Sequence, residues 1–194
     1  MQNRKSELIP GRFSRMLLIV LLAGVVLSAS CPQPVPRPLP AFEGSAKWAL
    51  NIAQPLIASF ASDAQLYNIL GAVIYKDGRL PSNTGDWSFV VWSASQQKQF
   101  QVTVKFDGTA STSTRSVTTP PSPSRQPIPN GWINSTEIFA ALAPHLVSGV
   151  THAQLVTLNL VNYPQAPNQA VWGISFNQGP NQLIMWDGTY LGHQ

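Results

Sequence analysis

The chain has little cysteine and few charged residues. The first shortage excludes an internal disulfide, and the second excludes a strongly charged surface. Its single cysteine is Cys31, so an intramolecular disulfide is excluded. Charged residues make up only 10% of the 194 residues, against about a quarter in an average soluble protein. Gln, Asn, Ser and Thr fill the polar positions instead. The sequence therefore predicts a surface that is polar but weakly charged.

Residues that carry chemistry are also scarce. The sequence has no Gly-x-Ser-x-Gly motif and no glycine-rich phosphate loop. Asp77, Asp107 and Asp187 each precede a glycine, where a carboxylate that caps its own turn explains the residue. No histidine has a second His, Cys or Glu at ligand spacing; the histidines are His145, His152 and His193. We therefore expect no metal, no cofactor and no enzymatic activity, with an enzyme of unidentified class as an alternative.

The basic character of the chain comes from its first 30 residues. The formal net charge is +4 and the isoelectric point is about 9.5. Four basic residues and one acid precede residue 31, which leaves eight basic and seven acidic residues in the rest. A net charge of about +1 attracts phosphate weakly. Nucleic acid is therefore not expected as a partner.

Residues 1–30 have the pattern of a signal peptide. A basic segment over residues 1–15 precedes an apolar run of about fourteen residues, Met16–Ala29. A membrane-spanning helix needs about 20 residues, so this run is too short for one. Small residues at 28–30 suit cleavage by a signal peptidase, and Cys31 follows directly. The pattern predicts export from a bacterial-type cytoplasm.

This arrangement resembles a bacterial lipoprotein signal, in which a cysteine after small residues receives a diacylglycerol. The departure is that Leu27 stands four residues before the cysteine, and Ser28 occupies the position that usually holds leucine. The resemblance implies that Cys31 is lipidated and that the lipid holds the chain on a membrane of the cell envelope. Residues 31–40 are Pro-rich, as expected of a stiff, extended tether. The alternatives are ordinary cleavage, which gives a secreted or periplasmic soluble protein, and an uncleaved anchor.

The remaining chain divides into two similar parts around a Ser/Thr/Pro-rich linker. We expect a first repeat over 41–115, the linker over 116–131, and a second repeat over 132–194. Each part has a helical segment, a short Ala-Gln-Leu word and an aromatic-Asp-Gly-Thr word. The Ala-Gln-Leu words are 64–66 and 153–155, and the aromatic-Asp-Gly-Thr words are 106–109 and 186–189. These matches predict a degenerate tandem repeat.

Each repeat is expected to begin with a helix. Apolar residues recur at helical spacing over 46–60, and Ser45 can cap that helix. Asn134 followed by Glu137 three residues later predicts a capping box for the second helix, whose apolar face would continue to Leu146. Proline lies inside each segment, at 55 and at 144.

Four strands are expected after each helix. Their ranges are 66–75, 87–93, 98–106 and 109–116 in the first repeat, and 155–163, 170–177, 182–186 and 189–193 in the second. Strand 98–106 alternates between apolar and polar residues, which indicates one buried and one open face. The fold class is α+β, as two tandem units in which one helix packs on an antiparallel meander of about four strands.

This order of elements and its Asp-Gly turns resemble the PepSY-like and β-lactamase-inhibitor-like families. These are small exported domains, often in tandem, with a helix packed on a curved sheet. The resemblance covers most of residues 45–193 and implies binding or inhibition of a protein through the exposed sheet face and loops. It transfers no specific functional residue to this chain.

The candidate binding residues come from the strand pattern. The chain has six tryptophans, and large exposed aromatics mark interfaces. Trp92 falls on the face opposite Trp87 and is expected on the open sheet face. The expected companions of Trp92 in binding a protein or peptide are Gln99, Gln101, Thr103 and Lys105. The alternatives are that Trp92 packs against the other repeat, and that the tryptophans stack on a small ligand or glycan.

Overall fold

A computed structural model describes residues 42–121, 126–159, 163–164 and 166–194. These described residues belong to one compact unit. The predicted signal peptide, the Pro-rich tether and Cys31 lie outside the described residues. In the described part of the chain, neither α-helix is long and apolar enough to cross a membrane.

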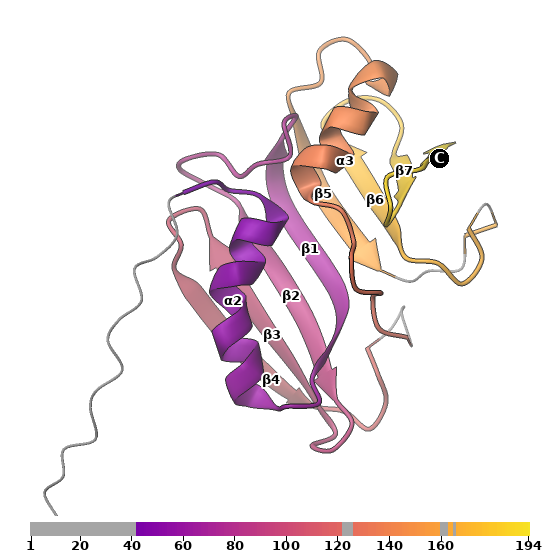
Figure 1. The fold of residues 1–194 in the computed structure, drawn as a ribbon. Coiled ribbons are helices and arrows are strands. Elements are labelled where there is room, and N and C mark those ends of the chain that lie inside the picture. The colour runs from indigo at the N-terminus through magenta and orange to yellow at the C-terminus, as the bar shows by residue number, and fades with distance from the viewer. Residues whose placement is uncertain (1–41, 122–125, 160–162, 165) are drawn as a thin grey trace, which may run out of the picture. The chain divides into compact units, whose positions relative to one another are not determined.

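The described chain begins with a helix and four strands, and a second helix and four strands follow (Figure 1). The first set comprises α2 (Ala46–Phe60), β1 (Gln65–Tyr75), β2 (Asp86–Ser93), β3 (Lys98–Lys105) and β4 (Ala110–Ser116). The second set comprises α3 (Ser135–Leu142), a 3-10 turn (Ala143–His145), β5 (His152–Asn159), β6 (Val171–Phe176), β7 (Gln182–Met185) and β8 (Tyr190–His193).

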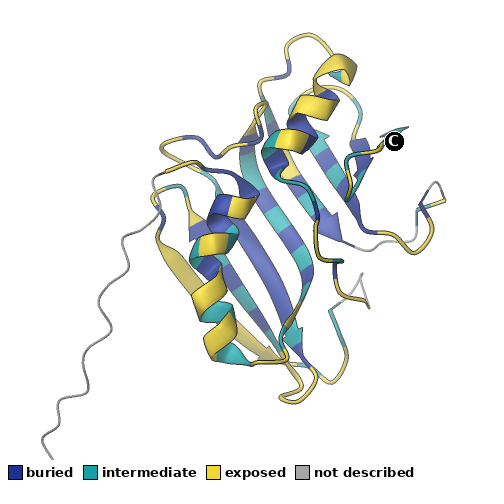
Figure 2. Ribbon diagram, viewed as in Figure 1, coloured by how far each residue is buried: buried dark blue, intermediate teal, exposed yellow. Residues whose placement is uncertain are grey.

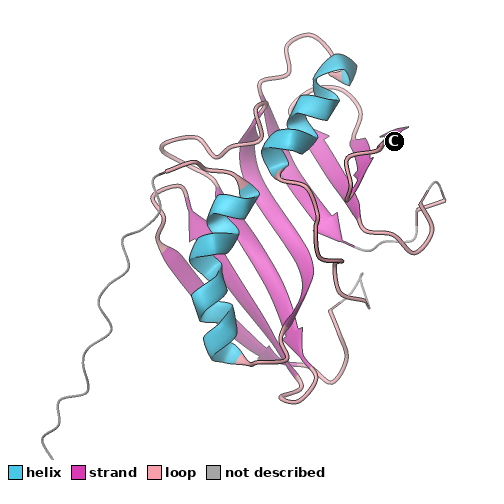
Figure 3. Cartoon of the chain, viewed as in Figure 1, coloured by secondary structure: helices cyan, strands magenta, loops and turns pink. Residues whose placement is uncertain are grey.

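All eight described strands belong to one antiparallel sheet in the order β4-β3-β2-β1-β5-β6-β7-β8 (Figure 3). Consecutive strands pair within each set, and the two sets meet where β1 pairs with β5. The predicted α+β class with antiparallel strands is confirmed. Both helices lie on the same face of the sheet, α2 over β2 and β3 and α3 over the strands that follow β1 (Figure 1).

Two predicted boundaries were wrong by three residues or more, while the ranges of the other helix and strands agree to within one residue at each end. Strand β5 begins at His152, three residues before the predicted start, and the described strand ends at Asn159. Helix α3 ends at Leu142 instead of reaching Leu146. The cause is Pro144, which has no N–H to continue the helical ladder and lies in the 3-10 turn. Pro55, by contrast, lies inside α2 without ending it.

The two helices begin side by side and share their caps. Both predicted N-caps are confirmed: the Ser45 hydroxyl accepts from the backbone of α2, and Asn134 forms a capping box with Glu137. Asn134 Oδ1 also accepts from Lys47 N at 3.1 Å, and its Nδ2 donates to Ser45 Oγ at 3.1 Å. Ser135 Oγ accepts from Ala46 N at 3.0 Å. The start of α2 is therefore completed by side chains from the start of α3, and the two capping side chains are bonded to each other.

The main core lies between the sheet and the helices (Figure 2). Its largest fully buried side chains include Trp87 and Phe89 from β2, Phe139 from α3 and Trp172 from β6. The segment Pro127–Trp132, called the strap below, also reaches this core. Ile128 and Trp132 of the strap are buried in it, although the sequence assigned most of the strap to a linker.

A second, smaller cluster lies on the opposite face of the sheet. Tyr163 and Ala166, from the connection between β5 and β6, pack against apolar side chains of β6 to β8; these are Val171, Leu183, Met185 and Leu191. Part of the sheet face without helices is therefore covered over β6 to β8, and no second cluster of this kind lies over β1 to β4 among the described residues.

Candidate functional site

The sheet face opposite the helices, called the open face below, carries the predicted binding residues. Trp87, Phe89 and Val91 of β2 are buried in the helix-covered core, so the residues between them point to the open face. Trp92 lies opposite Gln99 in the register of β2 and β3. The other predicted residues, Gln101, Thr103 and Lys105, alternate along β3 on the same face. The structure thus brings all five predicted side chains onto one face.

Three neighbouring polar side chains on the open face are hydrogen-bonded to one another. The Ser88 and Thr103 hydroxyls are 2.7 Å apart. Gln101 Nε2 donates to Ser88 Oγ at 3.3 Å and to Thr103 Oγ1 at 3.4 Å. These contacts hold the Gln101 amide over the sheet, and its carbonyl oxygen can still accept from a bound molecule.

Trp92 is half-buried and held in place by residues of the same half of the chain. Its ring meets the ring of Tyr67 edge-on at 6.1 Å between centroids, and its Nε1 donates to Val117 O at 3.4 Å. Tyr67 reaches the open face because a bulge interrupts the β1–β2 register between Leu66 and Asn68. Sequence reasoning missed Tyr67, since a one-residue bulge leaves no mark in the apolar run of β1.

Exposed apolar side chains extend the open face toward the other end of β1. Tyr75 follows the fully buried Ile74 and is 48% exposed. Leu155 of β5, which pairs with Ala72, is 45% exposed. Asp86 of β2 pairs with Ala72 of β1. Partial burial raises the pKa of the Asp86 carboxyl group, and the charge of the nearby Lys105 opposes that shift. Sequence reasoning missed this apolar end because it depends on the pairing of β1 with β5.

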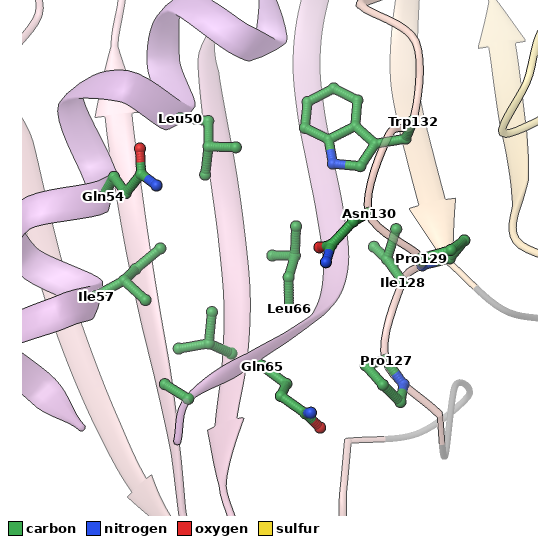
Figure 4. A pocket seen from close by; sticks show the side chains of 12 residues that line it. Leu50, Gln54, Ile57, Gln65, Leu66, Pro127, Ile128, Pro129, Asn130 and Trp132 are labelled. Atoms are coloured by element: carbon green, nitrogen blue, oxygen red, sulfur yellow. The ribbon is translucent and has the colours of Figure 1, made fainter. Parts of the chain in front are cut away.

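A groove of about 550 Å³ lies on the other face, between α2 and the strap (Figure 4). Leu50, Gln54 and Ile57 point into it from α2, across from the strap residue Trp132. The remaining lining residues come from the start of β1, from β2 and from the strap: Ala64, Gln65, Leu66, Val91, Pro127, Ile128, Pro129 and Asn130. The described residues that line the groove are all uncharged, so they suit an uncharged molecule.

Two titratable residues of the described chain, Asp63 and His145, make defined structural contacts. Asp63 accepts from Ser93 Oγ at 2.7 Å and from Ser95 N at 2.9 Å, which fixes the turn between β2 and β3. The Ser93 hydrogen bond is the main cause that lowers the pKa of Asp63 from 3.8 to about 2. His145 stacks on Tyr190 at 3.8 Å between ring centroids. Across the described ranges, no cluster of His, Cys, Asp and Glu could hold a metal ion.

Comparison with known proteins returns no relative. No family model matches the chain, and no curated protein or solved structure matches it either. The resemblance to the PepSY-like and β-lactamase-inhibitor-like families therefore stays a prediction from the order of elements.

Proposed function

We propose that this protein is a non-enzymatic, membrane-tethered lipoprotein of the cell envelope that binds a protein or peptide through its open face. The observation that carries the proposal is the asymmetry of the sheet. Both described helices cover one face, while the part of the other face over β1 to β4 carries no described helix and holds Trp92 beside a row of amide and hydroxyl groups. Aromatic side chains next to neutral hydrogen-bonding groups are typical of interface centres.

The chemistry of the open face favours a neutral polar partner over a charged one. Gln99, Gln101 and Thr103 can donate to and accept from a peptide backbone or amide side chains. Among the paired residues of β2 to β4, the charged side chains on this face are Lys105, Arg115 and Asp86. Such a face selects by shape and hydrogen bonding more than by long-range electrostatic attraction.

A tandem origin of the two halves supports the proposed relation to exported binding domains. In the first half, Lys105 N donates to Thr109 O at 2.9 Å, and in the second half Met185 N donates to Thr189 O at 2.9 Å. Both turns contain Asp-Gly, and in both the Asp carboxylate accepts from the Thr backbone. A bulge also interrupts the first strand of each half, after Leu66 and after Ala153. We therefore propose two units that share one sheet.

Membrane attachment through Cys31 is the second part of the proposal. It is supported by the sequence alone: a basic segment, a short apolar run, small residues and then the cysteine. Mass spectrometry of the protein purified from envelope membranes tests it directly. A mature N-terminus at Cys31 with an added diacylglycerol supports the anchor, and an unmodified Cys31 in a soluble protein contradicts it.

The binding test compares variants on the two faces of the sheet. Wild type, Trp92→Ala and Gln101→Ala are used to capture partners from envelope extract, with Gln54→Ala on the helix side as the matched control. We expect one saturable protein partner, weakened at least tenfold by Trp92→Ala and unaffected by Gln54→Ala. Equal capture by Trp92→Ala and wild type, with circular dichroism unchanged, would reject the open face as the binding site.

The groove supports a second candidate function, which is binding of a small neutral ligand or glycan. Its volume is in the range of about 300–1,000 Å³ that ligand sites occupy, and Trp132 lies in its wall. Neutral oligosaccharides and short uncharged peptides are titrated while tryptophan fluorescence is followed. A saturable change that disappears in Gln54→Ala but persists in Gln101→Ala would favour this candidate, and no change across the panel would reject it.

A further inference from the structure

Strand β4 forms one edge of the sheet that the described strands make. All seven of its residues are exposed (Figure 2), and among the described strands none pairs with its outer side. Proteins usually guard such an edge with proline, lysine or a bulge. β4 contains only Ser, Thr and Ala apart from Arg115, and it follows β3 without a break in register. Its edge is therefore open to another strand.

The hydrogen bonds at the two ends of the β3–β4 pair show which backbone groups face outward. Lys105 N donates to Thr109 O at 2.9 Å, and Val117 N donates to Gln97 O at 3.0 Å. Residues that bond to the neighbouring strand alternate with residues whose groups point away from it. The odd-numbered residues of β4 therefore bond to β3. The outward N–H and C=O groups belong to Ala110, Thr112, Thr114 and Ser116.

We propose that β4 pairs antiparallel with β4 of a second copy of this chain, in a register centred on Ser113. In that register Thr112 lies opposite Thr114 of the second copy, and Ala110 lies opposite Ser116. All of the outward backbone groups of both strands then find partners, whereas a shift by two residues leaves the groups at one end of each strand unpaired. The two sheets become one, with both sets of helices on the same side.

The side chains of β4 match a copy of themselves. Thr112 and Thr114 meet in Thr–Thr pairs on the helix side, which are favourable across antiparallel strands. On the open face Ser113 meets Ser113, and Arg115 lies opposite Ser111, so the two guanidinium groups do not face each other. The other edge strand, β8, is less suitable because it has four residues and a register break.

The expected dimer is weak but has a consequence for the proposed function. A single strand pair buries less than the roughly 1,200 Å² of a stable interface, so dimers form best where copies are concentrated, as on a membrane. The open faces of both copies lie on the same side and adjoin through β4. The dimer forms through the β4 edge and does not require a partner on the open face. The Trp92→Ala capture experiment therefore tests the proposed function and does not test the dimer.

Cysteine cross-linking tests the register in the full chain with Cys31→Ser. In the proposed dimer the two Ser113 residues form a non-hydrogen-bonded pair with Cα atoms about 4.5 Å apart, within the range that a disulfide spans. Ser111 of one copy lies about 14 Å along the strand from Ser111 of the other. On mild oxidation, Ser113→Cys should give at least tenfold more covalent dimer than the matched control Ser111→Cys. Equal cross-linking of the two variants, or none of either, would overturn the proposal.

A proline tests the backbone pairing separately. The Thr112 N–H points away from β3, so Thr112→Pro removes one outward donor without losing a bond inside the monomer. We expect the variant to keep the wild-type circular dichroism, to abolish cross-linking through Ser113→Cys and to sediment as a monomer. Wild type should dimerise with rising concentration. A wild type that stays monomeric at millimolar concentration, or cross-linking that survives Thr112→Pro, would refute the β4 interface.

Discussion

Replacement of Gly71 by alanine tests how closely β1 and β2 pack beneath α2. A Cβ at Gly71 would lie 2.5 Å from Cζ3 of Trp87 and 2.8 Å from its Cε3. The Trp87 ring is fully buried, and its Nε1 donates to Gly44 O at 3.0 Å. The ring therefore cannot turn away without losing that hydrogen bond or displacing the core around it.

The expected loss follows from three contributions. Overpacking of a well-packed core costs about 1–3 kcal/mol, and loss of the Trp87 hydrogen bond costs about 1 kcal/mol. The smaller entropy of alanine in the unfolded chain offsets about 0.4–1 kcal/mol. We expect Gly71→Ala to lower the free energy of unfolding by about 2 kcal/mol, and the Tm by about 4–8 °C for a protein of this size.

Urea unfolding of Leu39–Gln194, followed by circular dichroism, measures the effect. Gly173→Ala is the matched control, since a Cβ there meets Thr157 Oγ1 at 3.1 Å, a hydroxyl that can rotate, and we expect a change within about 0.5 kcal/mol. In a Trp87→Phe background, Gly71→Ala should cost little. Phenylalanine lacks the outer part of the indole, whose Cζ3, Cε3 and Cη2 atoms the new Cβ would meet. Equal losses for the two glycines, or a full loss in the Trp87→Phe background, would show that the contact is not the cause.

Three further predictions concern the caps and turns. Asn134→Ala should lower the free energy of unfolding by about 1–2 kcal/mol in urea unfolding, because Asn134 caps α3 and bonds to the start of α2; an unchanged midpoint contradicts the shared cap. The pKa of Asp63 is lowered from 3.8 to about 2, so its ionised form stabilises the fold above pH 4, and this contribution should disappear between about pH 4 and 2. Between these pH values the free energy of unfolding should fall less steeply for Asp63→Asn than for wild type. The same dependence on pH in both proteins would exclude the effect. Gly78→Ala should cost at least about 2 kcal/mol, because φ is +81° and the new Cβ would lie 2.4 Å from Ser135 O; Gly192→Ala, with φ at +112° and open space around its Cβ, isolates the backbone part of that cost.

Local patterns predicted most elements of the fold. The alternation in 98–106 predicted the range of β3 to within one residue and also its buried side, and the Asp-Gly word after it placed the turn to β4. Ser45 and Asn134 marked the helix starts, because a capping side chain needs only its own first turn. Since faces follow from alternation, the five predicted open-face residues could be placed together without knowing any pairing between the halves.

Features that depend on distant pairing could not be predicted. Nothing in the local pattern of β1 says that it pairs with β5, and the exposed apolar end at Tyr75 and Leu155 exists only because of that pairing. The burial of the strap could not be predicted, because its sequence has the composition of a linker. A single isoleucine among serines and prolines gives no periodic pattern, yet Ile128 is buried in the core. The groove could not be predicted either, since it lies between that strap and α2.

The shared caps of the two helices have a consequence for how the chain folds. Ala46 N and Ser135 Oγ are bonded across 89 residues, and β1 in the first half pairs with β5 in the second. Contacts this far apart in sequence slow folding, because a long loop must close before they form. A nascent chain that ends before residue 134 has an incomplete helix start, and its strand β1 lacks a partner on the side that later pairs with β5. Export before folding would let the two halves meet only when both are present, so the folding transition should be cooperative across the whole sheet.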